Sequence, residues 1–280
     1  MERTKDLLVI MPAYNEAACI GSFLERMEAA GISDIADMLV IDDGSSDDTG
    51  RVAREYGCAV VTHIYNMGYG TALLSGYKYA VRRGYAYVIQ IDSDGQHDPC
   101  NILPVYERLK GDGDAAGPDI VLGSRFLEGG KSFPISRLKK VAIGFFRKLI
   151  RLFTGKTVTD PTSGLQGLGS RALRYYSGYS NFDDRYPDAN MLIQMLLLGY
   201  RVEEIPAIMH AREMGSGMYG GLASKAAYMA HMAVSICAVL SRCLVLKEKQ
   251  RLRPGVEGIV NRETGADSGS GFQQEGNKNM

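Results

Sequence analysis

The sequence lacks several features that would point to common classes of protein. It contains no tryptophan, and its five cysteines include no Cys-x-x-Cys pair. An odd number of cysteines without such spacing disfavours a disulfide framework and a cysteine metal cluster, and favours a reducing cytosol. Basic and acidic residues balance at 32 each, so no global electrostatic field suggests a nucleic-acid partner.

The chain also lacks an apolar run of membrane-spanning length. Residues 1–6 are mostly polar or charged and lead directly into a strand pattern, which does not fit a secretory signal peptide. Residues 226–240 are mostly apolar but include His231, and Lys225 and Arg242 bracket them. Because a spanning helix needs roughly 20 apolar residues, we expect an interfacial helix here, or one that docks on a membrane partner.

What the sequence does contain is a regular alternation of apolar runs and helical patterns. A chain of 280 residues with 45% hydrophobic content can bury one domain core and carry an extension. Strands are expected at 7–11, 38–41, 59–62, 85–91 and 119–122, and helices at 16–30, 47–56, 70–83 and 99–110. This order predicts an α/β fold, with a mainly parallel sheet and helices on both faces. Ligands would then bind beyond the carboxyl ends of the strands.

We predict three parts along the chain. An α/β domain covers 1–215, an amphipathic, membrane-proximal helical segment covers 216–247, and a tail covers 248–280. The tail is rich in Gly, Ser, Gln and Asn, so it cannot bury enough apolar surface to fold and is expected to be disordered.

Asp92-Ser93-Asp94 follows the apolar strand predicted at 85–91. In an extended chain, side chains two residues apart point the same way, so both carboxylates can share one divalent cation. Such a metal would neutralise charge at a phosphate-handling site. An isolated Asp-x-Asp also fits a solvated acidic turn, so the neighbouring loops have to decide between the two interpretations.

Two other strand ends carry polar motifs, at 12–16 and 42–47. Ser46 or Asp47, in the second loop, is expected to cap the following helix. Capping does not require Asp42 and Asp43, however, and a carboxylate there can accept hydrogen bonds from a base or a ribose. No Gly-x-Gly-x-x-Gly follows the first strand, which disfavours a dinucleotide-binding Rossmann site. The glycine-containing loop 66–70 indicates a close approach of backbone before a helix.

Taken together, these motifs carry a family resemblance. They occur in order at 8–16, 40–45, 66–70, 92–97 and 123–126, followed by Asp160-x-x-Ser163-Gly164. In this combination the chain resembles the family 2 glycosyltransferases of GT-A fold, and within them the dolichyl- and polyprenyl-phosphate sugar synthases. The resemblance covers roughly residues 6–215. It implies a UDP- or GDP-linked sugar donor, Mg²⁺ or Mn²⁺, inversion at the anomeric carbon and a polyprenyl-phosphate acceptor.

The resemblance also implies roles for individual residues. Those expected to bind the nucleotide-sugar are Pro12, Tyr14, Glu16, Ile41, Asp43, Asp92, Ser93, Asp94, Arg125 and Arg212. Those expected to hold the metal are Asp92, Asp94 and Gln96. Arg137 is expected to meet phosphate groups, and Asp160 is the candidate carboxylate if the reaction needs one; holding the turn 162–164 is its alternative role.

Some positions depart from the family or stay open. The family often has a lysine after Gly-x-Ser near 212–218; this chain has none, which leaves the pyrophosphate contact of Arg212 open. The processive-synthase motif Gln-x-x-Arg-Trp cannot occur without tryptophan. His97 is expected to be structural, or to support a residue of the site, rather than to be catalytic. Asp183, Asp184 and Asp188 could line the acceptor site, and the pattern does not single one out.

The segment 131–159 contains eight lysines and arginines and no acidic residue, with apolar residues at helical spacing. A basic amphipathic helix suits an anionic membrane surface, where each basic residue contributes about 1 kcal/mol. The alternative is a helix packed on the core with a solvated basic face. We expect a cytoplasmic protein associated peripherally with the inner face of the membrane, working with a separate small membrane protein.

Other functions stay open from the residues alone. Within the enzyme class, the acceptor could be a growing polysaccharide or a lipid-linked glycan. A haloacid-dehalogenase-type phosphatase also places Asp-x-Asp after an apolar strand, but on its first strand, whereas here the motif follows the fourth. A nucleotide-sugar-binding regulator without turnover is the third class.

Overall fold

The computed structural model describes residues 5–111, 115–131, 133, 135–178, 180–211 and 222–252. Contacts divide the chain into a first unit, residues 1–240, and a second unit from residue 241 onward. The candidate site lies in the first unit.

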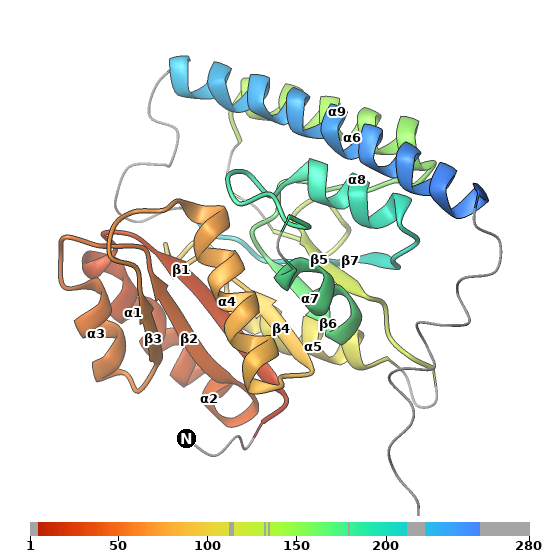
Figure 1. Cartoon of the computed structure of the whole chain (residues 1–280). Helices are drawn as coiled ribbons and strands as arrows, with labels where there is room; N and C mark the ends of the chain where they lie inside the picture. Colours follow the sequence, from red (N-terminus) through yellow and green to blue (C-terminus); the bar gives the residue numbers. More distant parts are fainter. Residues whose placement is uncertain are drawn as a thin grey trace, which may run out of the picture. The chain divides into compact units, whose positions relative to one another are not determined.

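A seven-stranded sheet lies at the centre of the first unit, in the order β3-β2-β1-β4-β6-β5-β7 (Figure 1). The strands are β1 (Leu7–Ala13), β2 (Asp37–Asp42), β3 (Ala59–Thr62), β4 (Tyr87–Gln90), β5 (Ile120–Ser124), β6 (Gln166–Gly169) and β7 (Val202–Pro206). β1 pairs in parallel with β2 and β4, β2 with β3, and β5 with β7. β6 runs antiparallel between β4 and β5. The predicted α/β fold with a mainly parallel sheet is confirmed, and the antiparallel insertion is an addition to it.

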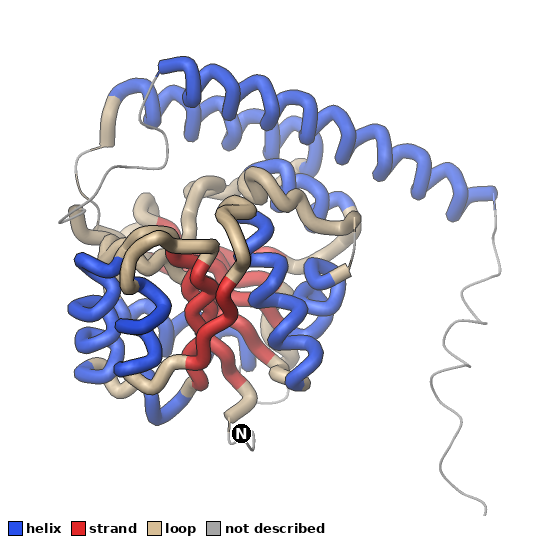
Figure 2. Tube along the Cα trace, turned by 60° about the vertical axis from the view of Figure 1, so that its left-hand side comes forward, coloured by secondary structure: helices blue, strands red, loops and turns tan. Residues whose placement is uncertain are grey.

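Helices cover both faces of this sheet, as Figure 2 shows. They are α1 (Ala17–Ala29), α2 (Ile32–Ile35), α3 (Thr49–Glu55), α4 (Tyr69–Arg83), α5 (Ile102–Lys110), α6 (Arg137–Thr154), α7 (Ser170–Ser177), α8 (Ala189–Leu197) and α9 (Leu222–Leu252), with a 3₁₀ turn at Pro99–Asn101. On α1, Ile20, Phe23 and Met27 recur at helical spacing and are buried in the core. On the other face, α4 approaches closely at Gly76, where an added Cβ would lie 3.1 Å from side-chain atoms of Ile10 and Ile41.

The basic segment predicted to be helical forms α6. It begins at Ser136, whose hydroxyl accepts a hydrogen bond from the Lys139 amide at 3.3 Å, and ends at Gly155 in the left-handed conformation. Ile143, Phe146 and Ile150 are buried. The opposite face exposes apolar side chains: Val141, Phe145 and Leu152 are 69%, 47% and 73% exposed. The helix therefore buries one apolar stripe and exposes a second, shorter set of apolar side chains among its basic residues.

α9 begins within the predicted segment 216–247 and continues to Leu252, beyond the predicted start of the tail at 248. Residues 253–280 lie outside the described residues, as do 216–221. Within the part of the chain that the structure describes, no helix is both long and apolar enough to cross a membrane. In the first unit, α9 lies beside α6, where the rings of Tyr228 and Phe146 are 6.4 Å apart at 89° (Figure 1).

Candidate active site

The predicted motif loops meet at the carboxyl ends of β1, β2 and β4, and they are bonded to one another. The Ser93 hydroxyl donates to the Pro12 carbonyl at 2.8 Å. Asn15, in the left-handed conformation with φ 54°, accepts a hydrogen bond from the Ser46 amide at 2.8 Å. We call residues 12–16, 42–49, 66–70 and 92–97 the motif edge. Its loops form one rigid rim because each loop satisfies polar groups of another.

Asp43 holds the glycine-containing loop of the motif edge. Its side chain is 5% exposed and accepts hydrogen bonds from the amides of Met67 at 2.9 Å and Gly68 at 2.8 Å. His63 Nδ1 contacts the same carboxylate at 2.6 Å. This carboxylate is thus engaged inside the protein, where it fixes the loop that precedes α4.

Asp92 stands between two side chains that orient it. Its Oδ1 accepts a hydrogen bond from the Tyr69 hydroxyl at 2.9 Å, and its Oδ2 lies 3.5 Å from His97 Nε2. His97 is fully buried, and neither ring nitrogen has a hydrogen-bond partner among the described residues. Burial raises the pKa of Asp92, but His97 and Tyr69 lower it more, so the net shift is downward. Asp92 is therefore ionised at neutral pH, and its side chain is 32% exposed.

The residues expected to hold a metal, Asp92, Asp94 and Gln96, all belong to the segment 92–97 of the motif edge. Asp94 shapes its own loop, since its Oδ1 accepts from the Gln96 amide at 3.0 Å. Arg26 supports the same loop by donating to the Gly95 carbonyl at 3.2 Å. No group of three or more His, Cys, Asp or Glu side chains that could hold a metal occurs among the described residues. Two carboxylates and an amide are what a Mg²⁺ site uses when a substrate supplies the remaining oxygens.

Asp160 forms a buried ion pair with Arg125. Asp160 is fully buried and Arg125 is 5% exposed. The guanidinium binds both carboxylate oxygens, from Nε to Oδ2 at 2.6 Å and from Nη2 to Oδ1 at 2.7 Å. A bidentate pair of this kind fixes the orientation of both groups. Both oxygens of Asp160 thus accept a hydrogen bond from Arg125, and this pairing stabilises the ionised carboxylate.

The rest of the Asp160-x-x-Ser163-Gly164 element joins β5 to the segment 92–97. The Ser163 hydroxyl donates to the Gly123 carbonyl at 2.6 Å. Gly164 packs directly on Asp92, and a Cβ at this position would overlap the Asp92 carboxylate. The glycine is needed because no side chain fits between this turn and the carboxylate.

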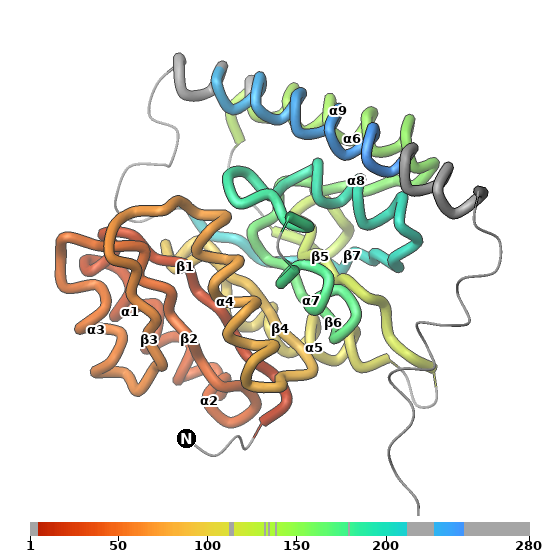
Figure 3. The backbone as a smooth tube through the Cα atoms, viewed as in Figure 1, coloured from red at the N-terminus to blue at the C-terminus, as the bar shows by residue number. Residues whose placement is uncertain are grey.

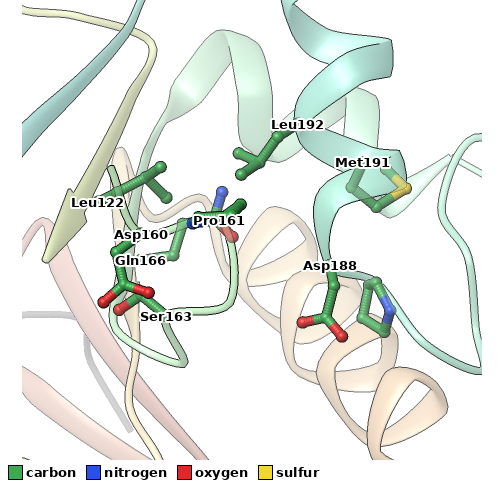
Figure 4. Close-up of a pocket in the computed structure, with 9 residues that line it drawn as sticks. Leu122, Asp160, Pro161, Ser163, Gln166, Asp188, Met191 and Leu192 are labelled. Carbon is green, nitrogen blue, oxygen red and sulfur yellow. The ribbon is translucent and has the colours of Figure 1, made fainter. Parts of the chain in front are cut away.

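Asp188 and Lys139 complete the site from the other side. A small pocket is lined by Asp160 and Ser163 and, across from them, by Asp188 and residues of α8 (Figure 4). Desolvation, and then the charges of Asp92 and Asp183, raise the pKa of Asp188 to about 6 against the opposing hydrogen bond from Tyr228. We call Arg125, Lys139, Asp160 and Asp188 the opposite wall, a set of residues outside the motif edge that includes both sides of this pocket.

Lys139 is exposed at the start of α6, and the charges of the site shift the pKa of its ammonium group. Partial desolvation and the charge of Arg125 lower its pKa, whereas Asp160, Asp92 and Asp188 act in the opposite direction. The opposite wall therefore combines a cation from α6 with a carboxylate from the loop before α8.

The remaining predicted residues fall into three groups. Those with buried side chains are Pro12, Ile41 and Ser93; a ligand would meet them through the backbone. Tyr14 is 48% exposed, Arg137 is exposed at the first position of α6, and Glu16 accepts a hydrogen bond from Cys19 Sγ at 2.9 Å. Arg212, with the loop 212–218, lies outside the described residues.

Three residues of the site were not among the predicted site residues. Tyr69 lies inside the loop 66–70, and its bond to Asp92 has no signature in the sequence. Lys139 is one of eight basic residues in its segment, and Asp188 is one of three aspartates that the motifs could not separate. The tertiary packing of α6 against α8 sets where Lys139 and Asp188 lie.

Comparisons with known proteins identify the family and the fold of the chain. The model of the family described as Glycosyl transferase family 2 matches residues 8–176. An undecaprenyl-phosphate mannosyltransferase from Micrococcus luteus is 30% identical over 79% of this chain and 90% of its own. A polyprenol monophosphomannose synthase from Mycolicibacterium smegmatis is 29% identical over 78% and 82%. Among solved structures, glucosyl-3-phosphoglycerate synthase from Mycobacterium tuberculosis aligns with TM-score 0.59 and 23% identity, covering 86% of this chain and 80% of that one. This likeness confirms the predicted GT-A fold.

Proposed function

Because the chain belongs to glycosyl transferase family 2, we propose that it moves a sugar, with inversion, from a nucleotide-sugar to a polyprenyl phosphate at a membrane surface. The observation that carries this proposal is the meeting of two elements. The Asp160-x-x-Ser163-Gly164 turn meets the motif edge, because Gly164 packs directly on the Asp92 carboxylate. The relatives named for undecaprenyl and polyprenol phosphates support the acceptor class.

The donor diphosphate would lie at the motif edge, with Mg²⁺ or Mn²⁺ held by Asp92, Asp94 and Gln96. A bound divalent ion would neutralise the diphosphate and stabilise the leaving nucleotide. The Tyr69 hydroxyl holds one oxygen of Asp92 by a hydrogen bond, and His97 Nε2 lies 3.5 Å from the other, so little reorganisation would be needed when the ion binds. The exposed ring of Tyr14 and the loop fixed by Asp43 would frame the nucleoside, whether UDP- or GDP-linked.

The acceptor would approach along the opposite wall. A phosphate monoester has a second pKa of about 6 by analogy with phosphorylated side chains, so it is largely dianionic at pH 7 and needs little general-base help. Lys139 would attract and position this phosphate, since the charge of Arg125 is offset by Asp160. If a carboxylate takes part in proton transfer, Asp188 is better suited than Asp160, both of whose oxygens bind Arg125.

The outer stripe of α6 would lie on the membrane. Lys148 and Arg151 are exposed close to Phe145 and Leu152, a combination that suits an anionic lipid surface. Arg147 is not part of this surface, because it donates to the Thr159 carbonyl at 2.6 Å. We propose peripheral association with the cytoplasmic, inner face. A small membrane protein could contact the 226–246 stretch of α9.

The test is transfer of radiolabelled sugar from UDP- and GDP-sugars to a polyprenyl phosphate in vesicles, with Mg²⁺ or Mn²⁺. The expected product is an organic-extractable, mild-acid-labile glycolipid. Label found only in water-soluble glycan would instead favour a polysaccharide acceptor, and donor binding without any transfer would favour a regulator. The phosphatase interpretation has no support from the family to which the chain belongs.

A further inference from the structure

The part of α9 in the first unit carries a polar stripe that faces the site. Tyr228, His231 and Ser235 are spaced i, i+3 and i+7, so they lie on one face of the helix. All three contact the loop 183–188, which precedes α8. A helix that only covered an apolar surface would need no such stripe.

Ser235 joins α9 to the first residues of this loop. Its hydroxyl donates to Asp183 Oδ2 at 2.7 Å, and the side-chain amide of Asn190 donates to the same oxygen at 2.6 Å. The other oxygen of Asp183 accepts from the amides of Arg185 at 2.9 Å and Tyr186 at 3.1 Å. Asp183 therefore ties the backbone of the loop to α9.

Tyr228 joins α9 to the last residue of the loop. Its hydroxyl donates to Asp188 Oδ2 at 2.7 Å. Its ring packs edge-on against Tyr186, with centroids 5.3 Å apart at 83°, and against Phe146 of α6. The carboxylate of the opposite wall is thus oriented by a side chain of α9.

The opposite side of the same loop packs on the first turn of α4. An added Cβ at Gly70 would lie 2.5 Å from the carbonyl carbon of Asp184, and the Thr71 hydroxyl donates to the Asp184 carbonyl at 3.2 Å. Tyr69, one residue earlier, holds Asp92. Figure 3 shows the loop between α7 and α8 extending towards the start of α4. We call residues 183–188 the bridge segment, because it contacts α9 on one side and the support of Asp92 on the other.

We propose that α9 sets the position of Asp188 through the bridge segment, and that Tyr228 is a positioning residue for the acceptor side of the reaction. This inference rests on the proposed function for its effect on turnover, but not for its effect on the bridge segment. Seating of α9 fixes one oxygen of Asp188 and the loop backbone.

Tyr228→Phe tests this directly, because it keeps the ring packing and removes only the hydroxyl. We expect turnover with the lipid acceptor to fall about tenfold, which is the scale of losing one hydrogen bond to a charged group. Affinity for the nucleotide should stay unchanged. The matched control is Tyr85→Phe, which removes the same kind of bond, from Tyr85 to Asp37 Oδ2 at 2.7 Å, beside the start of β4.

Two further measurements separate positioning from general loosening. In an Asp188→Asn background, Tyr228→Phe should add no further loss, because the two residues act as one unit. Hydrogen exchange of a peptide covering 183–190 should be faster in Tyr228→Phe and in Ser235→Ala, but not in Tyr85→Phe.

The inference is overturned by additive losses in the double variant, by full turnover of Asp188→Asn, or by unchanged exchange in Tyr228→Phe. If the wild-type protein transfers no sugar to any lipid phosphate, the proposed function fails. The exchange measurement then decides by itself whether α9 holds the bridge segment.

Discussion

The motif edge and the opposite wall are built in different ways. The motif edge consists of four short, contiguous segments whose polar groups bind one another, as Asp43 binds the amides of Met67 and Gly68. The opposite wall consists of single side chains from separate elements, such as Lys139 on α6 and Asp188 before α8. The first construction leaves a readable pattern in the sequence, whereas the second leaves isolated charged residues.

The contrast also concerns what each side can tolerate. At the motif edge, many hydrogen bonds between backbone amides and short polar side chains fix the positions of the loops. At the opposite wall, the geometry depends on a few charged groups, above all the buried pair of Arg125 and Asp160. Single substitutions at the opposite wall should therefore lower the free energy of unfolding more, and those at the motif edge should lower the rate of the reaction more.

The largest effect is expected for a substitution at the opposite wall, where we predict a loss of stability. Asp160→Asn leaves the Arg125 guanidinium buried without its counter-charge, so we expect unfolding to require about 3–5 kcal/mol less free energy. Denaturant titration measures this loss. The control is Glu203→Gln, which breaks a pair with Arg108 in which both side chains are 39% exposed, and should cost less than about 1 kcal/mol. Equal losses in both variants would contradict the contrast.

Asp94→Asn tests the expectation that substitutions at the motif edge affect the reaction rate. It keeps the shape of the side chain and removes its charge. Losing one electrostatic contact to the reacting phosphates should lower the transfer rate by roughly 10²–10³-fold. The melting temperature should hardly change, since Asp94 is part-exposed on a loop. A folded variant with full activity, or undiminished wild-type activity in EDTA, would remove the metal assignment.

Gly164→Ala tests the contact between the turn that follows Asp160 and Asp92 of the motif edge. The added methyl group would overlap the Asp92 carboxylate and must displace it, so we expect roughly a 10–100-fold loss of metal affinity, as for other groups that orient ligands. Titration of Mn²⁺ in the presence of nucleotide measures this directly. Gly144→Ala is the matched control, because nothing lies within 4 Å of its added Cβ; unchanged Mn²⁺ affinity in Gly164→Ala would show that the turn can move away.

The smallest expected effect concerns the outer stripe of α6. Replacing Lys148 and Arg151 by Gln should weaken binding to anionic vesicles by about 1 kcal/mol per residue. Added salt should weaken wild-type binding in the same way, by screening. Arg147→Gln is a useful comparison, because its bond to the Thr159 carbonyl predicts a loss of stability rather than of vesicle binding. Equal vesicle binding by wild type and double variant would leave the stripe as a solvated face.

The sequence by itself determined the parts whose physics is local. Alternating apolar runs and helical patterns are sufficient for the first five strands and for α6, because strand and helix periodicity depend on neighbours in the chain. The Asp-x-Asp at the end of β4 was recognisable because its two carboxylates are only two residues apart. Boundaries shifted by a few residues, and α2, β6, β7, α7 and α8 had no assigned pattern.

Only the tertiary structure decided how these parts form one site. β6 inserts antiparallel between β4 and β5, and this pairing carries Gly164 onto Asp92 across more than seventy positions of sequence. The bond from Tyr228 to Asp188 likewise depends on how α9 packs on the bridge segment. No local pattern encodes such contacts, since they arise when buried faces far apart in the chain meet and fix the polar groups between them.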